Sequence, residues 1–282
     1  MMGDIPESAV RDIVSRALAE DVGSGDMTTA ALVAPEAECR AEIVAKAEGV
    51  IAGLGVARLV FGMLDPQIEF HEVVADGGRV SKGITVARLS GNTRAVLAAE
   101  RTALNFLQRM SGIASLTAEY VEAADGADAR IIDTRKTAPG LRLLDKYAVR
   151  MGGGRNHRVG LFDGVLIKDN HLRAAGGVGE AVRRARKAVH HLAKIEVEVQ
   201  TLEEVEEGVA AGADVILLDN MDLDDIRRAV DLVSGRCEIE VSGGVTLERV
   251  SALAECGVDY ISAGSLTHSA PALDLSLEVA DD

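Results

Sequence analysis

Basic side chains gather in one segment of an acidic chain. The 282 residues include 30 Lys and Arg against 45 Asp and Glu, a formal net charge of −15. Within residues 133–172 the balance reverses, and the basic residues there are Arg135, Lys136, Arg142, Lys146, Arg150, Arg155, Arg158 and Lys168. Arginine binds carboxylates and phosphates through paired hydrogen bonds. The segment therefore predicts a binding site for a ligand with several negative charges, such as a polycarboxylate or a pyrophosphate.

Six apolar runs in the second half of the chain have the length of buried strands. They cover residues 129–134, 164–169, 194–199, 214–219, 238–244 and 259–264. Most are separated by helical patterns, and such repeated units with continuous apolar strands are typical of a parallel sheet covered by helices. The repeat predicts an α/β barrel of the TIM type that is incomplete. An open, doubly wound sheet is the alternative fold.

Residues that can do chemistry stand where these runs end. They are Thr134, Arg135 and Lys136; Lys168; Glu198; Asp219; Ser242, Gly243 and Gly244; and Ala263, Gly264 and Ser265. One polar residue at a strand end is usually a helix cap or a turn, so Glu198 or Asp219 alone would carry little weight. Arg142 and Lys146, four apart on a predicted helix, are expected to be surface charges. The whole set predicts a site, because the carboxyl ends of barrel strands converge on one face.

This set divides into three kinds of site. The turns at 242–244 and 263–265 offer backbone N–H groups to a phosphate. The cations form a second, larger anion site and comprise Arg135, Lys136, His157, Arg158 and Lys168. Glu198 and Asp219, expected on neighbouring strands, are predicted to hold Mg²⁺ or sugar hydroxyls.

The first half of the chain has a different pattern. A helix is expected near the N-terminus, with Pro6 close to its start, and short strand-like runs follow between residues 41 and 91. One helix near residues 56–63 interrupts them, and clustered strands with few helices predict a small antiparallel α+β domain. A long helical stretch over residues 93–124, expected to break near Gly112, marks the boundary between two domains.

Composition argues against several classes of partner. Aromatic residues make up 2% of the chain and Trp is absent, so base-stacking platforms for single-stranded nucleic acid are not expected. The acidic balance also disfavours binding to phosphate backbones. No apolar run has the length of a membrane span, and the N-terminus lacks the pattern of a signal peptide. The three cysteines lack CxxC spacing, which predicts reduced thiols in a cytoplasmic protein without a zinc site.

The motifs of the chain resemble those of the quinolinate phosphoribosyltransferase family. The most specific are TRKTAPGLR at 134–142, NHR at 156–158 and KDNH at 168–171. EDVGSGDMTT, ERTALNFLQRMSGIAS, IEVEV, VILLDN, SGGVT and SAGSLTHS occur in the family's order. The likeness therefore extends over essentially the whole chain.

The resemblance implies a fold and an assembly. It implies an N-terminal α/β sandwich domain over residues 1–112, joined by the C-terminal segment 270–282. An open, seven-stranded α/β barrel would cover residues 113–269. The chain would form a homodimer in which each N-terminal domain closes the partner's site, and a hexamer built as a trimer of dimers is compatible with the family.

The resemblance also implies a reaction and its residues. Quinolinate and 5-phosphoribosyl 1-diphosphate would give nicotinate mononucleotide, pyrophosphate and CO₂, with Mg²⁺ as cofactor, in NAD biosynthesis. Quinolinate would be bound by Arg101, Thr134, Arg135, Lys136, His157 and Arg158. Lys168, Glu198 and Asp219 would meet the phosphoribosyl donor, the last two with Mg²⁺. The 5′-phosphate would lie on Ser242, Gly243, Gly244, Ala263, Gly264 and Ser265.

The chain departs from the family pattern at three positions, and two other functions compete with the implied one. Met151 and Arg155 flank the triple glycine where a small residue and a His are expected, and Gln200 stands where an acidic residue or Asn is common. One alternative is a paralogue of the same fold linked to molybdenum transport. The other is a catalytically silent nucleotide-binding protein. Retention of the complete cationic set and of Asp219 favours the quinolinate enzyme over both.

Overall fold

The computed structural model of the protein describes residues 5–280 and contains two compact units. Of the described residues, one unit comprises 5–118, 138–153 and 269–280, and the other 119–137 and 154–268. The expected division stays a prediction; it placed 138–153 with the barrel and drew the boundary at residue 112. The reason for the difference lies in the helices α4 (Thr93–Ala123) and α5 (Arg142–Met151).

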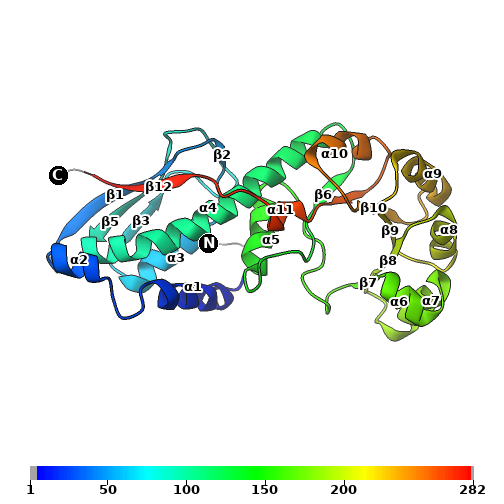
Figure 1. Ribbon diagram of the computed structural model, residues 1–282, viewed down its shortest axis with the longest axis horizontal. Helices are drawn as coiled ribbons and strands as arrows, with labels where there is room; N and C mark the ends of the chain where they lie inside the picture. Colours follow the sequence, from blue (N-terminus) through cyan, green and yellow to red (C-terminus); the bar gives the residue numbers. More distant parts are fainter. Residues whose placement is uncertain (1–4, 281–282) are drawn as a thin grey trace. The chain divides into compact units, whose positions relative to one another are not determined.

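The first unit is built on a four-stranded antiparallel sheet with the order β12-β1-β5-β3 (Figure 1). Its strands are β1 (Glu38–Ala45), β3 (Glu69–Glu72), β5 (Thr85–Asn92) and β12 (Leu275–Val279). A separate pair joins β2 (Gly49–Val50) to β4 (Arg79–Val80). The helices are α1 (Glu7–Asp21), α2 (Met27–Leu32), α3 (Leu54–Leu64) and the two just named. The small antiparallel domain predicted from the clustered runs is therefore present, and β12 brings the end of the chain to its edge.

Helix α4 continues through Gly112, so the predicted break at that residue is wrong. A Cβ at Gly112 would come within 2.0 Å of the Pro271 carbonyl oxygen. The glycine therefore serves the close approach of the C-terminal segment to the helix, which outweighs its low helix propensity.

Polar side chains of helix α5 make hydrogen bonds to residues of the first unit. The carboxylate of Asp145, fully buried, accepts hydrogen bonds from Arg109 Nε at 3.0 Å and Nη2 at 2.9 Å. Tyr147 donates to Asp76 at 2.7 Å. Lys146 is 2% exposed, so its prediction as a surface charge is wrong. The helix lies in a packed interior where each of these polar groups needs a partner.

The second unit is an incomplete α/β barrel. Its parallel strands are β6 (Arg130–Ile132), β7 (Val165–Ile167), β8 (Ile195–Val199), β9 (Val215–Asp219), β10 (Glu238–Ser242) and β11 (Tyr260–Ser262). Their order is β6-β11-β10-β9-β8-β7, so the first strand pairs with the last. This closure distinguishes a barrel from the doubly wound alternative. The gap lies between β6 and β7.

Six helices of this unit follow its strands (Figure 1). They are α6 (Asp169–Ala175), α7 (Val178–Ala188), α8 (Leu202–Ala210), α9 (Leu223–Val233), α10 (Leu247–Ala254) and the short α11 (Ser265–His268). Along β8, the apolar residues Ile195, Val197 and Val199 are buried and alternate with Glu196 and Glu198. Since successive strand residues face opposite sides, the two glutamates share the other face of the sheet, inside the barrel.

The described residues form six barrel strands where the resemblance implied seven. Beside β6, Arg155 makes a single parallel bridge with Ile132. The next two residues, Asn156 and His157, donate to the side chain of Asp133 at 2.6 and 2.9 Å instead of extending a ladder. The segment beside β6 therefore forms one isolated bridge and not a seventh strand, within the described residues.

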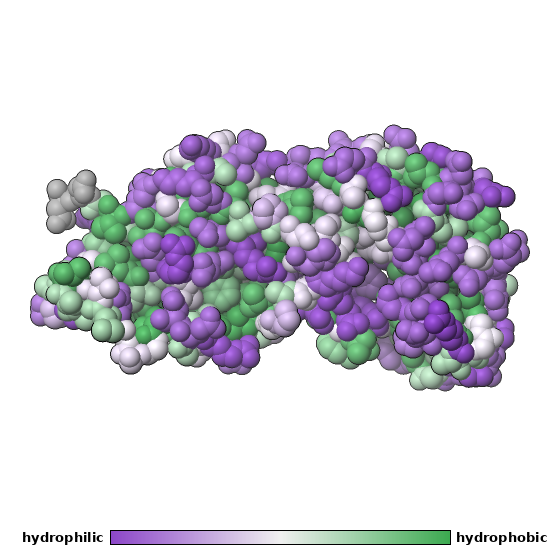
Figure 2. All heavy atoms as spheres, viewed as in Figure 1, coloured by the Kyte–Doolittle hydropathy of each residue, from purple (hydrophilic) through white to green (hydrophobic). Residues whose placement is uncertain are grey.

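Both units have aliphatic interiors and mostly hydrophilic surfaces. On the face shown in Figure 2, purple residues cover much of the surface and the apolar patches are small. Among the described residues, the helices include none that is long and apolar enough to cross a bilayer.

Candidate active site

A cavity of about 440 Å³ opens at the carboxyl ends of the barrel strands. It is lined by Thr134, Arg135, Lys136, His157, Arg158, Leu166, Lys168, Leu217, Glu198, Asp219, Asn220, Glu240, Ser242, Gly243, Gly244 and Ser262. Most of the residues predicted from the strand ends are thus brought together, as the convergence of parallel strands requires.

The loop after β6 is held in place by a buried carboxylate. Asp133 has no exposed surface and accepts from the Asn156 amide and the His157 backbone N–H. Thr134 Oγ1 accepts from the Lys136 N–H at 3.0 Å, and the Lys136 carbonyl accepts from Thr267 Oγ1 at 2.8 Å. These bonds fix the backbone from which Arg135 and Lys136 extend.

Two arginines, Arg135 and Arg158, lie in the wall of the cavity and repel each other. Burial lowers the pKa of Arg158 below its usual value, and the neighbouring Arg135 cation lowers it further, against the attraction of Glu196 and Asp163. Arg158 Nη1 donates to the Gly164 carbonyl at 2.9 Å. Its Nε is buried and has no hydrogen-bond partner among the described residues. A donor of this kind, in a wall of like charges, is suited to an anion.

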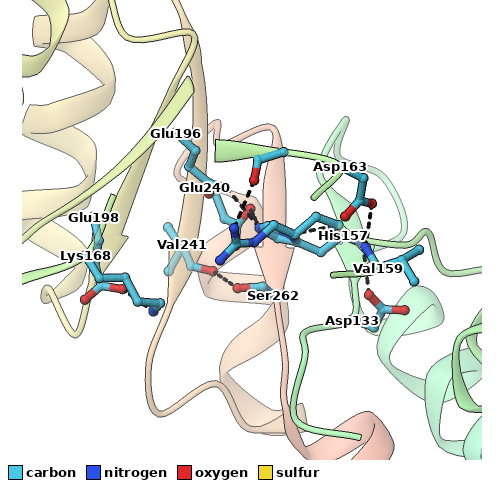
Figure 3. A network of polar contacts seen from close by, with 12 residues as sticks. Asp133, His157, Val159, Asp163, Lys168, Glu196, Glu198, Glu240, Val241 and Ser262 are labelled. Atoms are coloured by element: carbon cyan, nitrogen blue, oxygen red, sulfur yellow. Dashed lines mark hydrogen bonds and ion pairs between the residues drawn. The ribbon is translucent and has the colours of Figure 1, made fainter. Parts of the chain in front are cut away.

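The opposite wall carries carboxylates. Lys168 Nζ pairs with Glu198 Oε2 at 2.6 Å. Figure 3 shows the two side chains close together. Asp219 ends β9 and accepts from Gln200 Nε2 at 3.3 Å. The N-cap of the following helix α9 is Asp222, so Asp219 is not the cap that its position alone suggested.

A glycine turn follows β10. Gly243 and Gly244 have φ of 86° and 57°, in the left-handed region that favours glycine. A Cβ on Gly243 would come within 2.3 Å of the Asn220 side chain. Asn220 itself has φ of 57° and its N–H donates to the Ser242 carbonyl at 3.0 Å. The turn therefore presents backbone close to the cavity, as the phosphate prediction requires.

Comparison with known proteins identifies the origin of this arrangement. A family model described as the N-terminal domain of quinolinate phosphoribosyl transferase matches residues 26–111, and the model of its C-terminal domain matches residues 113–278. A probable carboxylating nicotinate-nucleotide pyrophosphorylase of Bacillus subtilis (strain 168) is 46% identical over 270 residues, covering 96% of this chain and 93% of the relative. The chain belongs to the quinolinate phosphoribosyltransferase family.

Other members of the family agree with this placement. The chloroplastic carboxylating nicotinate-nucleotide pyrophosphorylase of Arabidopsis thaliana is 45% identical over 293 residues, covering 97% of this chain and 84% of the relative. The crystal structure of NadC from Streptococcus pyogenes superposes with a TM-score of 0.94 at 44% identity, covering 99% of both chains. The nicotinate-nucleotide pyrophosphorylase of Francisella tularensis gives a TM-score of 0.93 at 39% identity, also over 99% of both chains.

Some residues predicted from the family resemblance do not line the cavity. Arg101 is exposed on α4, in the first unit. Ala263 is 1% exposed, and Ser265 Oγ lies 3.1 Å from the Tyr120 hydroxyl. A Cβ on Gly264 would meet the Lys136 side chain at 2.8 Å, so this glycine makes room for a cation. Of the two turns predicted to bind phosphate, the one at 242–244 lines the cavity and the one at 263–265 does not, within the described residues.

The donor set of the cavity fits the magnesium ion that the family resemblance implied. Mg²⁺ is usually held by one or two carboxylates, with the remaining positions filled by water and substrate phosphates. Glu198 and Asp219 supply two carboxylates in the cavity wall, and the Lys168 ion pair shows that this corner already holds a cationic group.

Two buried residues were not predicted as site residues. Glu196 and Glu240, 7% and 3% exposed, lie beneath His157 (Figure 3). Burial and the neighbouring Glu196 raise the pKa of Glu240 well above its usual range. The alternation in IEVEV and EIEVS was the available signal, since it places Glu196 beside Glu198 and Glu240 beside Ser242 on the interior face.

Proposed function

We propose that the chain transfers the phosphoribosyl group of 5-phosphoribosyl 1-diphosphate to quinolinate with loss of CO₂. The products are nicotinate mononucleotide and pyrophosphate, and the reaction belongs to NAD biosynthesis. Membership of the family and the printed activity of its relatives support the reaction type. The observation that supports the substrate is the pair Arg135 and Arg158, which are partly buried and whose mutual repulsion is relieved by a bound dianion.

Quinolinate lies against the cationic wall in this proposal. Its two adjacent carboxylates need more than one cation, and Arg135 and Arg158 are supplemented by Lys136 and by the polar Thr134. The buried Nε of Arg158 supplies a donor for one carboxylate oxygen. Arginine is suited to this task because its fork binds a carboxylate through two bonds.

The phosphoribosyl donor occupies the other side of the cavity. Its 5′-phosphate lies on the Ser242–Gly244 turn, whose N–H groups and small residues let an anion approach the backbone. In this proposal Gly264 contributes indirectly, because the absence of a side chain there leaves room for Lys136. Lys168 faces the pyrophosphate, and Glu198 and Asp219 hold the ribose hydroxyls.

The chemistry needs no nucleophilic side chain. The pyridine nitrogen attacks C1′ of the ribose as the bond to pyrophosphate breaks, and the leaving group takes the electron pair. When bound to Glu198 and Asp219, Mg²⁺ neutralises charge on the pyrophosphate. The pyridinium nitrogen then accepts the electrons released as the C2 carboxylate leaves as CO₂, and a proton takes its place. The residues of the chain orient both substrates and stabilise charge.

The proposed assembly is a homodimer located in the cytoplasm, with hexamers formed as trimers of dimers as a further state. In the dimer, Arg101 of the partner subunit reaches the quinolinate site. The exposure of Arg101 on α4 is compatible with such a role. The three cysteines are thiols, in keeping with a reducing compartment.

One assay tests the reaction. The purified chain is incubated with quinolinate, 5-phosphoribosyl 1-diphosphate and Mg²⁺, and CO₂ and nicotinate mononucleotide are measured together. Equal amounts of the two products are expected. Nicotinate, which lacks the second carboxylate, serves as the control base and should give no nucleotide. Nucleotide formed equally well from nicotinate would overturn the proposed substrate.

A further inference from the structure

A buried acid pair lies directly beneath the quinolinate wall. The Nε2 of His157 is 3.0 Å from Glu196 Oε2 and 3.7 Å from Glu240 Oε2. The side chains of the two glutamates are 9% and 4% exposed, and that of His157 is 13% exposed. Figure 3 shows the three converging from β8, β10 and the segment that contains His157, before β7. A carboxylate so deep in a barrel is costly unless it is hydrogen-bonded.

The hydrogen bonds of His157 determine where its proton lies. The backbone N–H of Arg158 donates to His157 Nδ1 at 2.6 Å, so Nδ1 carries a lone pair and no proton. The ring proton is therefore on Nε2, where it is donated to Glu196. Both ring nitrogens are engaged by the protein itself. The family resemblance predicted that His157 binds the substrate carboxylates, whereas both of its ring nitrogens contact the protein itself.

The same bonds connect the acid pair to Arg158. Glu196 accepts from the ring of His157, the ring accepts from the Arg158 backbone, and Asp133 accepts from the His157 backbone at 2.9 Å. On the other side of Arg158, Nη1 donates to the Gly164 carbonyl. The position of the arginine thus depends on a chain of contacts that ends in the barrel interior.

We propose that Glu196, backed by Glu240, is a positioning residue that orients Arg158 for quinolinate by holding His157 in its Nε2–H tautomer. The proposal deepens the quinolinate function and rests on it. Glu196 touches no substrate; it acts through the imidazole. A neutral acceptor at the same position serves as well as a carboxylate, because what the site needs is an acceptor for the Nε2–H.

Steady-state kinetics of two variants test this role. Glu196→Ala removes the acceptor and is expected to raise KM for quinolinate about tenfold, in line with the loss of a hydrogen bond to a buried group. Its kcat and its KM for 5-phosphoribosyl 1-diphosphate should change by less than about twofold. Glu196→Gln keeps an acceptor oxygen and should restore the quinolinate KM to within about threefold of the wild type.

Glu238→Gln is the matched control. Glu238 lies two residues before Glu240 on β10, at the amino end of the strand, where it accepts from Tyr260 and pairs with Lys194. Its KM values should equal those of the wild type. Equal losses of kcat and of thermal stability in Glu196→Ala, with no change in KM, would reduce Glu196 to a packing role and overturn the proposal.

A spectroscopic measurement decides the matter independently of activity. ¹⁵N NMR of the imidazole groups, with His157→Asn to assign the signal, should show a protonated Nε2 and an unprotonated Nδ1. Glu196→Ala should shift this signal, and Glu196→Gln should largely restore it. A doubly protonated His157, or one indifferent to Glu196, contradicts the proposal. If the wild type turns over no quinolinate but shows the expected tautomer, the proposed substrate fails and the positioning network stands.

The three ligand atoms of His157, Glu196 and Glu240 lie within 4.8 Å of one another, which is also compatible with a metal ion. Titration of the protein with Zn²⁺ alone, followed by calorimetry, separates the two uses. No stoichiometric binding is expected, because the surroundings include the cations of Arg158 and Lys168. Tight binding that Glu196→Gln abolishes would replace the positioning role by a metal site.

Discussion

Charged residues line a cavity at each end of the barrel, but the basic side chains have different neighbours at the two ends. At the amino ends of the strands, a cavity of about 490 Å³ is lined by Lys194, Asp214, Arg236, Glu238 and Asp259, among others. There the hydrogen bond from Lys194 to Glu238 raises the pKa of the lysine. At the carboxyl ends, burial and Arg135 lower the pKa of Arg158. At the amino end a carboxylate pairs with the lysine, whereas at the carboxyl end the charge of one arginine acts against that of another.

This difference in electrostatics distinguishes the ligand site from the other cavity better than their volumes do. Arg186 pairs with Asp214 at 2.6 Å, and Asp214 and Asp259 also accept backbone N–H groups of β8 and β10. These carboxylates hold strands together. Where a cation is buried beside another cation, folding has left an electrostatic cost that a bound anion removes. The comparison predicts that substitutions at the carboxyl end change activity, and that those at the amino end do not.

Arg158→Ala is expected to have the largest effect. Loss of one partner of a buried ion pair with the substrate costs about 2–5 kcal/mol, or roughly 30-fold to several thousand-fold in KM for quinolinate. Arg135→Ala should behave alike. Steady-state kinetics with saturating phosphoribosyl donor measure the effect. An unchanged KM in either variant would remove that residue from the quinolinate site.

Asp219→Asn should have the next largest effect, on the other substrate. The amide binds Mg²⁺ and ribose hydroxyls less well, so kcat/KM for 5-phosphoribosyl 1-diphosphate should fall at least about tenfold and the Mg²⁺ requirement should rise. Asp222→Asn is the control three residues away. Asp222 caps α9 by accepting from the Asp225 N–H at 2.9 Å, and Asn caps equally well. If both variants lost activity alike, the effect would come from the loop and not from a ligand role.

The barrel and its strand-end residues could be predicted from the sequence because both follow from local patterns. All six barrel strands coincide with the apolar runs. The residues that follow the strands therefore lie at the carboxyl-end face of the barrel. The resemblance supplied the substrate, which no pattern in the chain specifies. Contacts between distant segments were not predictable. Gly112 is next to Pro271 and Lys146 is buried, and neither fact is visible in the residues around them.

Within the site, the least predictable feature was the acid pair. Glu196 and Glu240 lie on non-adjacent strands, β8 and β10, with β9 between them, where Glu196 is in register with Val215 and Glu240 with Leu217. Their partner His157 comes from a segment that the strand pattern did not include. Gln200, noted as a departure from the family pattern, proved to be a hydrogen-bond partner of Asp219. Its role depends on the register of β8 against β9, which the sequence does not state.

Glu240→Gln should affect stability in a pH-dependent way. The pKa of Glu240 is raised in the folded protein by burial and by Glu196, from a usual value near 4.5. The contribution of the protonated Glu240 to the free energy of unfolding is therefore fully present below pH 4.5. It is lost as the pH rises through the folded-state pKa. The amide cannot ionise, so the variant should melt at a higher temperature than the wild type in alkaline buffer, and the difference should vanish near pH 4. Differential scanning calorimetry across pH measures this. A variant less stable than the wild type at alkaline pH would contradict the assigned direction.

Lys194→Met tests the amino end and should have the smallest effect. The side chain of Lys194 is 64% exposed and its partner Glu238 34% exposed, so the pair contributes at most about 1 kcal/mol to the free energy of unfolding. Because the pKa of Lys194 is raised, that contribution is present at neutral pH and is lost only as the pH rises through the folded-state pKa of the lysine. Glu238 keeps its hydrogen bond from Tyr260 at 3.0 Å, which limits the cost of removing the lysine. The melting temperature should fall by no more than about 4 °C at pH 7, and both KM values should stay at the wild-type level. A large loss of activity in this variant would mean that the charges at the amino end serve the reaction too, and the contrast between the two ends of the barrel would no longer locate the site.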